Sequence, residues 1–307
     1  AFLRAKEDYL MGINFSRLLS LKYGNEIARF LNQKYVVISV GRVMTCVLGM
    51  VVNREREIRS FQAQSFYRIL SKMNILGKST EGEWKAVEGS AYYQSPKLYK
   101  ENGFQREEDA QELINQLKSI EPVEAMVQKV EQKKETKNPP LLYNLAEIQN
   151  DCSKLFKINP DETLKVVQEL YEKKMVTYPR TDARVLSTSV AKEIAVNLKG
   201  LCNLNAVREV AQEILTQGNY KNISKTRYVN DKQITDHYAI IPTGQGIHEL
   251  GKLKPIAAKI YEIIVRRFLA IFLPPAIYKK ITLETMIQEE HFFTSFKVLI
   301  DPGYYKV

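Results

Sequence analysis

Apolar residues change their spacing three times along this chain, and this alternation limits the folds that it can adopt. In residues 1–60 and 139–272 they recur three to four positions apart, which is typical of helices. In residues 61–138 and 273–307 they alternate with polar residues, which is typical of strands. Because one core rarely serves 307 residues, we predict a multidomain α+β protein in which a helical insertion interrupts one β-rich domain.

Prolines and helix caps mark the start of the helical insertion. Residues 138–140, Asn-Pro-Pro, follow a charge-rich run and break the chain. Asn144 is predicted to cap a helix, because Glu147 follows it in a capping-box pattern. Asn159 is predicted to cap the next helix, because a proline and two acidic residues follow it. That second helix is expected to place Tyr171 on its apolar face.

The composition favours a polyanionic partner. The chain has 45 Lys and Arg against 35 Asp and Glu, a net charge of +10, and such residues bind nucleic acids by neutralising phosphates. No apolar run approaches the roughly 18 residues of a membrane span, and the charged first residues do not resemble a signal peptide. Cys46, Cys152 and Cys202 are far apart and odd in number, so they favour neither a zinc site nor disulfides, and we expect a reducing cytoplasm.

Residues 177–182, which read TYPRTD, place a candidate nucleophile beside a cation and a carboxylate. Pro179 disfavours a helical Tyr178, so the phenol is expected at a strand end or a turn. A phenol, with a pKa of about 10, is a weak nucleophile unless it is helped. Arg180 could favour the phenolate or hold a phosphate, and Asp182 could orient Arg180 or move a proton. From these residues alone, an ordinary turn with a structural ion pair remains the alternative.

Two further segments carry polar residues suited to phosphate chemistry. In residues 235–243, TDHYAIIPT, His237 stands beside a carboxylate and could donate to a phosphate or act as acid or base. Residues 39–45, SVGRVMT, are expected to start a helix where backbone amides, Arg42 and Thr45 could bind phosphate. The alternatives are a structural histidine and a capped helix with a surface arginine.

Seven segments, taken in order along the chain, resemble motifs of the type IA DNA topoisomerases, nearest to the topoisomerase III branch. They are residues 7–17 (EDYLMGINFSR), 38–45 (ISVGRVMT), 52–58 (VNREREI), 139–149 (PPLLYNLAEIQ), 177–182 (TYPRTD), 236–243 (DHYAIIPT) and 302–304 (PGY). Together they cover essentially the whole chain in the family's own order. An unrelated α+β nucleotidyl enzyme would match these motifs in this order only by coincidence. The ordered matches therefore argue against that alternative.

The resemblance implies part of a topoisomerase toroid. Residues 1–60 would form a helical DNA-binding lobe, residues 61–138 and 273–307 a β-rich arch, and residues 139–272 a mostly helical gate domain that carries the catalytic tyrosine. Tyr178 would attack a single-strand phosphate and form a 5′-phosphotyrosyl bond. Arg180 would hold that phosphate, with Asp182 and His237 in support. The DNA-binding residues that the resemblance implies are Asn14, Arg17, Arg42, Thr45 and Thr181.

The sequence departs from the family pattern at four of these places. Met44 stands where the family has Gln, Tyr238 replaces the second His of a pair, Ala183 replaces Ser and Tyr9 replaces Trp. The nucleophile, Arg180 and His237 are all retained. One polar DNA contact, at Met44, is therefore not expected here.

The family's chemistry uses Mg²⁺ held by an acidic Toprim domain. No equivalent cluster is found in this sequence, since Glu107-Glu108-Asp109 is predicted to be a solvated helix face. We therefore expect no metal site in this chain and expect the Mg²⁺ ligands in a Toprim domain of the same polypeptide, before Ala1.

Two functions are consistent with these residues. The whole protein would be an ATP-independent isomerase, a monomer in the cytoplasm, that relaxes negatively supercoiled DNA or decatenates it. The alternative is a non-catalytic clamp on single-stranded DNA. Without its Toprim domain, this chain alone is expected to bind DNA but not to cleave it normally.

Overall fold

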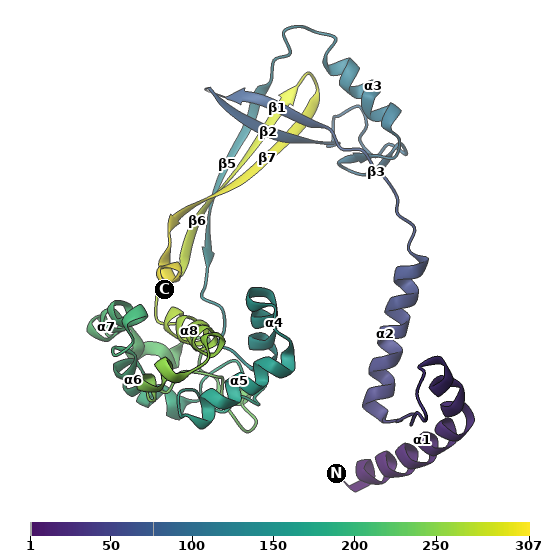
Figure 1. The fold of residues 1–307 in the computed structure, drawn as a ribbon. Helices are drawn as coiled ribbons and strands as arrows, with labels where there is room; N and C mark the ends of the chain where they lie inside the picture. Colours follow the sequence, from purple (N-terminus) through teal and green to yellow (C-terminus); the bar gives the residue numbers. More distant parts are fainter. Residues whose placement is uncertain (1, 76) are drawn as a thin grey trace. The chain divides into compact units, whose positions relative to one another are not determined.

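The computed structural model describes residues 2–75 and 77–307. They form two compact units, Ala1–Phe66 and Tyr67–Val307, and each is described here by itself. The first unit is helical, and the second combines an antiparallel sheet with a helical domain (Figure 1). The predicted α+β class is confirmed.

The first unit contains two helices, α1 (Phe2–Phe30) and α2 (Arg42–Ser60). Gly41 is the N-cap residue of α2, so the predicted helix start after the SVG segment is correct. No residue of α2 is buried. The apolar residues that suggested this helix, Val47 and Met50 among them, are more than half exposed within the unit.

Small residues on α1 hold the segment that leads to α2. Ser16 and Ser20 lie four positions apart, one turn along the same face of the helix. Their hydroxyls accept hydrogen bonds from the backbone amides of Val40 and Ile38, both at 2.8 Å. A Cβ atom at Gly24, one turn further, would lie 2.8 Å from a backbone oxygen of the same segment. The extended chain can approach α1 this closely because these side chains are small.

The second unit contains a five-stranded antiparallel sheet, in the order β1-β2-β7-β6-β5 (Figure 1). Its strands are β1 (Leu70–Ile75), β2 (Lys78–Lys85), β5 (Met126–Lys137), β6 (Ala276–Ile287) and β7 (Glu290–Asp301). A short pair, β3 (Leu98–Lys100) and β4 (Gly103–Phe104), and helix α3 (Glu107–Leu117) accompany it. Strands from before and after the helical insertion therefore share one sheet, as predicted.

A compact aromatic core closes one end of this sheet. Trp84 on β2 is fully buried, stacks on Phe104 with ring centroids 4.9 Å apart, and pairs in register with Phe292 on β7. Its indole nitrogen donates a hydrogen bond of 2.6 Å to the buried carboxylate of Glu290. The other carboxylate oxygen of Glu290 accepts from the backbone amide of Ala91 at 3.0 Å. Both oxygens of this buried acid are thus satisfied.

Helix α3 differs from its prediction at one residue. Glu107 and Glu108 are exposed, as a solvated helix face requires, but Asp109 is buried. Its carboxylate lies 3.0 Å from Arg106 Nε and 2.9 Å from Lys97 Nζ. Two cations from neighbouring segments pull this one acid inward, a tertiary effect that a charge run does not reveal.

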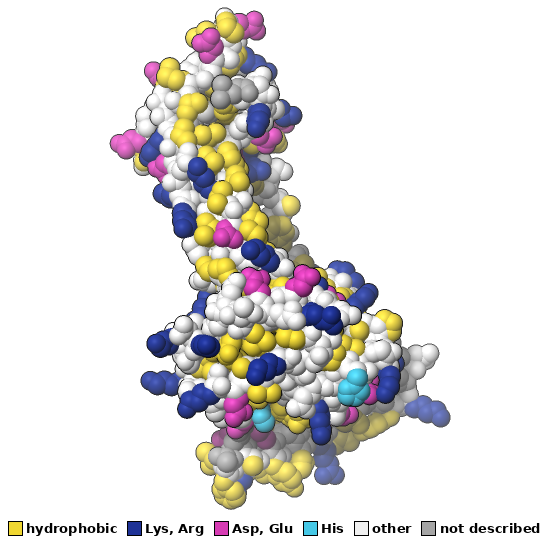
Figure 2. Space-filling view, turned by 90° about the vertical axis from the view of Figure 1, so that its left-hand side faces the viewer, with side chains coloured by type: hydrophobic (Ala, Val, Ile, Leu, Met, Phe, Trp, Pro, Cys, Tyr) yellow, Lys and Arg dark blue, Asp and Glu magenta, His cyan; other side chains and the backbone are white. Residues whose placement is uncertain are grey.

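The long strands also carry exposed apolar residues. Figure 2 shows hydrophobic side chains along the strands, with lysines and arginines beside them. The exposed apolar residues of β5 and β7 include Val130, Phe296 and Val298. Alternation in these strands therefore separates a mixed apolar face from a charged one, without burying either completely.

The helical domain, here called the gate domain, lies between β5 and β6 in the sequence. Its helices are α4 (Leu145–Phe156), α5 (Pro160–Glu172), α6 (Thr188–Leu201), α7 (Arg208–Gln217) and α8 (Pro255–Ala270). Short 3-10 turns lie at Asn205–Val207, Asn219–Lys225, Asp231–Gln233 and Ile247–Lys252, and another, Gly303–Lys306, follows β7. One cluster of buried apolar residues from all five helices forms its core.

Both predicted caps of the gate domain are confirmed. Asn144 Oδ1 accepts from the amide of Glu147 at 2.9 Å, and Asn159 Oδ1 accepts from Glu162 at 2.8 Å. Helix α5 ends at Glu172, and Lys174 then adopts a left-handed conformation with φ +60°. This turn directs the chain into the segment that carries the tyrosine of interest.

Candidate active site

Tyr178 lies in an irregular segment that leaves the end of α5. Before it, Val176 forms a β-bridge with Pro242, so the TYPRTD segment runs beside the HYAIIPT segment. The half-buried ring of Tyr178 contacts two other rings. The ring centroid of Tyr171 lies 5.4 Å away in an edge-on arrangement, and that of His237 lies 4.4 Å away. The phenol is thus outside regular structure, as the following proline predicted.

Two threonines bracket Tyr178 and join its segment to that of His237. Thr177 Oγ1 donates to the carbonyl of Ala239 at 3.0 Å and accepts from the amide of Ile241 at 2.9 Å. Thr181 Oγ1 donates to the carbonyl of His237 at 2.9 Å. Because each hydroxyl bonds the neighbouring segment, the tyrosine and the histidine are held at a fixed separation.

Thr181, a predicted DNA-binding residue, is held by hydrogen bonds within the protein. The residue is buried, and besides donating to His237 its hydroxyl accepts from the amide of Ala183 at 3.1 Å. These bonds give Thr181 a part in holding the loop. Its contact with DNA stays a prediction.

The start of α4 forms hydrogen bonds with the TYPRTD loop. Leu145 N donates to the carbonyl of Thr181 at 3.1 Å, and Asn144 Nδ2 donates to the carbonyl of Asp182 at 3.0 Å. Ile240 N donates to the carbonyl of Tyr143 at 2.8 Å. Residues 139–149 thus contact both loops of the site through Tyr143, Asn144 and Leu145, which gives a physical reason for this motif.

A partly buried polar network holds that segment in turn. Arg267 on α8 bonds Asp151 on α4 at 2.8 Å and lies 4.2 Å from the centre of the Tyr143 ring. The Tyr143 hydroxyl donates to Asp151 at 2.7 Å. Burial, with the Asp151 carboxylate, raises the pKa of Tyr143 above the usual phenol range. Tyr143 therefore stays protonated and serves as a structural phenol.

The three other predicted catalytic side chains, Arg180, Asp182 and His237, are exposed. Within residues 2–75 and 77–307, no ion pair joins Arg180 to Asp182, although their spacing allowed one. The backbone carbonyl of Asp182 accepts a hydrogen bond from Asn144. Within the described residues, the exposed guanidinium of Arg180, two positions after Tyr178 in the sequence, therefore has no carboxylate partner.

The predicted DNA-binding residues Asn14, Arg17, Arg42 and Thr45 lie in the first unit and are all exposed. Asn14 bonds its own helix, since its Nδ2 donates to Leu10 O at 2.8 Å. Arg42 pairs with Glu7 at 3.5 Å and Asp8 at 3.2 Å, and both contacts are solvent-exposed. Since these residues and Tyr178 belong to different units, their meeting at one DNA strand stays a prediction.

A groove of about 590 Å³ opens beside Tyr178. Its lining residues are Tyr171, Glu172, Lys174, Val176, Thr177, Tyr178, His237, Tyr238, Thr243 and Gln245. The sequence indicated Tyr178 and His237 but not Tyr171, which was expected on a buried helix face and is 39% exposed. Its position in the last turn of α5, seven residues before Tyr178, was the available signal.

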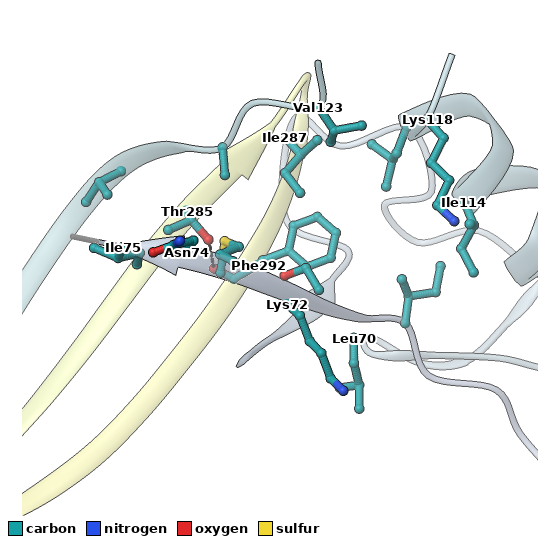
Figure 3. A pocket seen from close by; sticks show the side chains of 16 residues that line it. Leu70, Lys72, Asn74, Ile75, Ile114, Lys118, Val123, Thr285, Ile287 and Phe292 are labelled. Carbon is teal, nitrogen blue, oxygen red and sulfur yellow. Dashed lines mark hydrogen bonds between the residues drawn. The ribbon is translucent and has the colours of Figure 1, made fainter. Parts of the chain in front are cut away.

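A second hollow, of about 490 Å³, lies in the β-rich arch (Figure 3). Apolar side chains such as Ile114, Ile287 and Phe292 line it, together with Lys72 and Lys118. The described residues that line it include no carboxylate, histidine or cysteine. Of the four catalytic candidates, Tyr178 and His237 line the groove, whereas Arg180 and Asp182 are not among its described lining residues.

Neither a metal cluster nor a membrane helix is found in the described part of the chain. Residues 2–75 and 77–307 bring together no group of three or more His, Cys, Asp or Glu side chains that could hold an ion. The donors present do not fit a Mg²⁺ site, which takes several oxygen ligands. Across the same residues no helix has the length and apolar character to cross a bilayer.

Comparisons with known proteins find relatives that match almost the whole chain. DNA topoisomerase 3 of Bacillus cereus is 30% identical over 308 residues, which cover 100% of this chain and 38% of that protein. DNA topoisomerase 3 of Bacillus subtilis is 31% identical over 306 residues, covering 99% of this chain and 37% of that protein. The structure of full-length topoisomerase I from Thermotoga maritima matches the fold with a TM-score of 0.64, at 22% identity, over 99% of this chain and 45% of that one.

The chain thus spans well under half the length of these relatives. The sequence model of the family described as DNA topoisomerase matches residues 1–307. The match covers both loops of the groove and both units of the structure, and the chain belongs to the type IA DNA topoisomerase family.

Proposed function

We propose that the full-length protein is a type IA topoisomerase that cuts one DNA strand with Tyr178, passes another strand through the break and reseals it. The observation that carries this proposal is the placement of Tyr178: its phenol lines an open groove on a loop that two threonine hydroxyls brace against His237. Relaxation of negatively supercoiled DNA and decatenation are both compatible with this site.

The proposed step is a transesterification. The Tyr178 oxygen attacks the phosphorus, a P–O bond to Tyr178 forms, and the P–O3′ bond breaks. The phenolic proton is lost, and the leaving 3′ oxygen takes up a proton. The phosphate stays on the 5′ end as a phosphotyrosyl ester, so the bond energy is conserved and no ATP is needed. Attack by the 3′ hydroxyl reverses the step and reseals the strand.

Three side chains are proposed to assist Tyr178. Arg180, exposed and without an internal carboxylate partner in the described chain, would hold the phosphate and stabilise charge on its oxygens. His237, with its ring against Tyr178, would donate to the phosphate or move the proton. Asp182, exposed on the same loop, would support Arg180 once DNA is bound.

DNA, mainly single-stranded, is the proposed partner, and the first unit is proposed to contact it next to the cleavage site. Arg17, Arg42, Thr45 and Asn14 would make these contacts. The salt bridges of Arg42 are exposed, and such pairs contribute at most about 1 kcal/mol, so a DNA phosphate could replace them. We further propose that the protein works as a cytoplasmic monomer.

Mg²⁺ is proposed as the cofactor, held outside this chain by a Toprim domain of the same polypeptide. The metal would neutralise phosphate charge when bound. For this chain by itself, a non-catalytic clamp on single-stranded DNA is the second candidate, supported by the net charge of +10.

The experiment that tests the proposal compares full-length protein with its Tyr178→Phe variant on supercoiled plasmid and Mg²⁺. Phenylalanine keeps the ring contacts with Tyr171 and His237 but removes the nucleophilic oxygen. We expect loss of both relaxation and the covalent DNA adduct. Tyr220→Phe, a half-buried tyrosine of the gate domain outside the groove, is the matched control and should retain both.

Two results would count against these assignments. Relaxation by the Tyr178→Phe protein would show that another group is the nucleophile. A covalent adduct formed by this 307-residue chain alone with Mg²⁺ would show that the chain cleaves DNA without a Toprim domain, contrary to expectation.

A further inference from the structure

The groove beside Tyr178 has more aromatic surface than the cleavage step uses. Three tyrosines and one histidine line it: Tyr171, Tyr178, His237 and Tyr238. Only Tyr178 and His237 have roles in the proposed chemistry. Its volume of about 590 Å³ lies within the roughly 300–1,000 Å³ of sites that enclose a small organic ligand.

Tyr171 presents its ring to the groove rather than to the core. It lies in the last turn of α5 and is 39% exposed, whereas its neighbour Leu170 is fully buried. The ring meets Tyr178 edge-on, at an interplanar angle of 77°. Because the edge of one ring meets a face of the other in this arrangement, Tyr178 covers at most one face of the Tyr171 ring and leaves the other to a planar ligand.

Further lining residues of the groove come from the HYAIIPT segment and the residues just after it. Tyr238 is half-buried there, and burial raises the pKa of its phenol, so it stays neutral. Gln245, an exposed residue, adds an amide that can both donate and accept hydrogen bonds. These groups suit a flat, polar-edged, uncharged ligand, which is the chemistry of a nucleobase.

The groove also contains one cation suited to a phosphate. Lys174 is exposed and makes no ion pair within the described chain. Its backbone is fixed, because its carbonyl accepts a hydrogen bond from Thr243 Oγ1 at 2.5 Å. A stacking surface together with a lysine is the combination that binds single-stranded nucleic acid without reading its sequence.

We propose that this groove is a nucleotide subsite. It binds the base of the nucleotide whose 5′ phosphate becomes bonded to Tyr178, and that base stacks on Tyr171. The inference rests on the proposed function, since the phosphate at the Tyr178 oxygen brings its own nucleoside within reach of the groove. The gate domain then holds the cut end by stacking as well as by the covalent bond.

The test is an abasic scan along a single-stranded oligonucleotide, using full-length protein with Tyr178→Phe so that no strand is cut. In this background, Tyr171→Ala should weaken binding of the intact oligonucleotide roughly tenfold or more. It should not weaken binding when the nucleotide directly 3′ of the cleavage point is abasic. Tyr171→Phe should restore binding, because it keeps the ring. Tyr171→Leu, which keeps bulk without a π face, should behave like the alanine variant.

A second measurement separates stacking from charge. Lys174→Gln should weaken the binding of the intact and the abasic oligonucleotide equally. It should also reduce the slope of log affinity against log salt by about 0.7. Tyr171→Ala should leave that slope unchanged. A 2-aminopurine at the same position should lose fluorescence on binding and regain it with Tyr171→Ala.

The outcomes distinguish this subsite from the proposed function. Equal loss of affinity for intact and abasic oligonucleotides would overturn the subsite, as would an effect spread over all scanned positions. If the wild-type protein forms no covalent adduct, the proposed function fails instead. A single Tyr171-dependent position would then show the groove to be a base-binding site that no cleavage accompanies.

Discussion

At the scale of single residues, the two threonines beside Tyr178 explain how an irregular loop can hold a reactive group in place. Each hydroxyl both donates and accepts, so Thr177 and Thr181 join two segments that no regular strand pairing connects. Serine could make the same bonds, but valine, with the same shape as threonine, could make none. The pair of substitutions separates hydrogen bonding from packing.

We therefore predict that Thr181→Val in the full-length protein slows single-turnover cleavage, by up to about a hundredfold, because Tyr178 loses its fixed separation from His237. The buried partners left without a hydrogen bond should also cost the gate domain about 1–3 kcal/mol in denaturant unfolding. Thr181→Ser should restore most of the rate. A Thr181→Val protein that cleaves normally would show that the bond to His237 does not position the loop.

Residue roles differ in how far the sequence reveals them. The catalytic roles of Tyr178 and His237 stay proposals, but the placement of the two residues near each other was predictable from the order of the family motifs. The inward direction of the Thr181 hydroxyl was not, because it depends on the His237 segment 56 residues away. Asp109 was misjudged for the same reason, since its partner Lys97 lies outside its helix.

At the scale of elements, α3 depends on that buried acid at its first turn. The side chain of Asp109 is 5% exposed and accepts from Arg106 and Lys97. Arg106 first, and then Lys97, lower the pKa of Asp109 below its ordinary value of 3.8. A carboxylate with a lower pKa in the folded state stabilises the fold at pH values above the ordinary pKa. That stability is lost as the pH falls through the folded-state value.

We predict that Asp109→Asn destabilises the arch at neutral pH and removes part of its acid sensitivity below about pH 4. Trp84, the one tryptophan of the chain, shares a core cluster with α3 and reports arch unfolding by its fluorescence. Glu108→Gln is the control, since that side chain is 85% exposed and should leave the acid transition unchanged. Identical acid transitions in the wild-type and Asp109→Asn proteins would contradict this account.

Elements were also the level at which prediction from sequence succeeded most. The caps at Asn144 and Asn159 follow from local hydrogen bonding, which the sequence shows directly. The pairing of β2 with β7 does not, because Trp84 and Glu290 are 206 residues apart. Alternation predicted the strands on both sides of the insertion, but only the tertiary core decides which strand pairs with which.

At the scale of the whole molecule, the positive charge and the division into two units are both consistent with DNA as the partner. The first unit carries exposed arginines and two helices with little buried surface, and the second carries the proposed nucleophile, Tyr178, on a well-packed helical domain. Neither unit alone contains all the residues that the family resemblance implies for DNA binding and cleavage. If both units bind DNA, the first would neutralise phosphate charge and the second would carry out the cleavage chemistry.

We predict from this division that affinity for single-stranded DNA falls steeply with salt, and that arginines of the first unit contribute to the slope. For single strands, each neutralised phosphate contributes about −0.7 to the slope of log affinity against log salt. Arg17→Gln and Arg42→Gln should each reduce the slope by about that amount while leaving the Tyr171-dependent base effect intact. Arg59→Gln, at the far end of α2 and paired with Glu55, should change neither quantity. Salt-independent binding would remove the electrostatic basis of the clamp, and an equal effect of Arg59→Gln would show that only net charge matters, not the predicted DNA-binding residues.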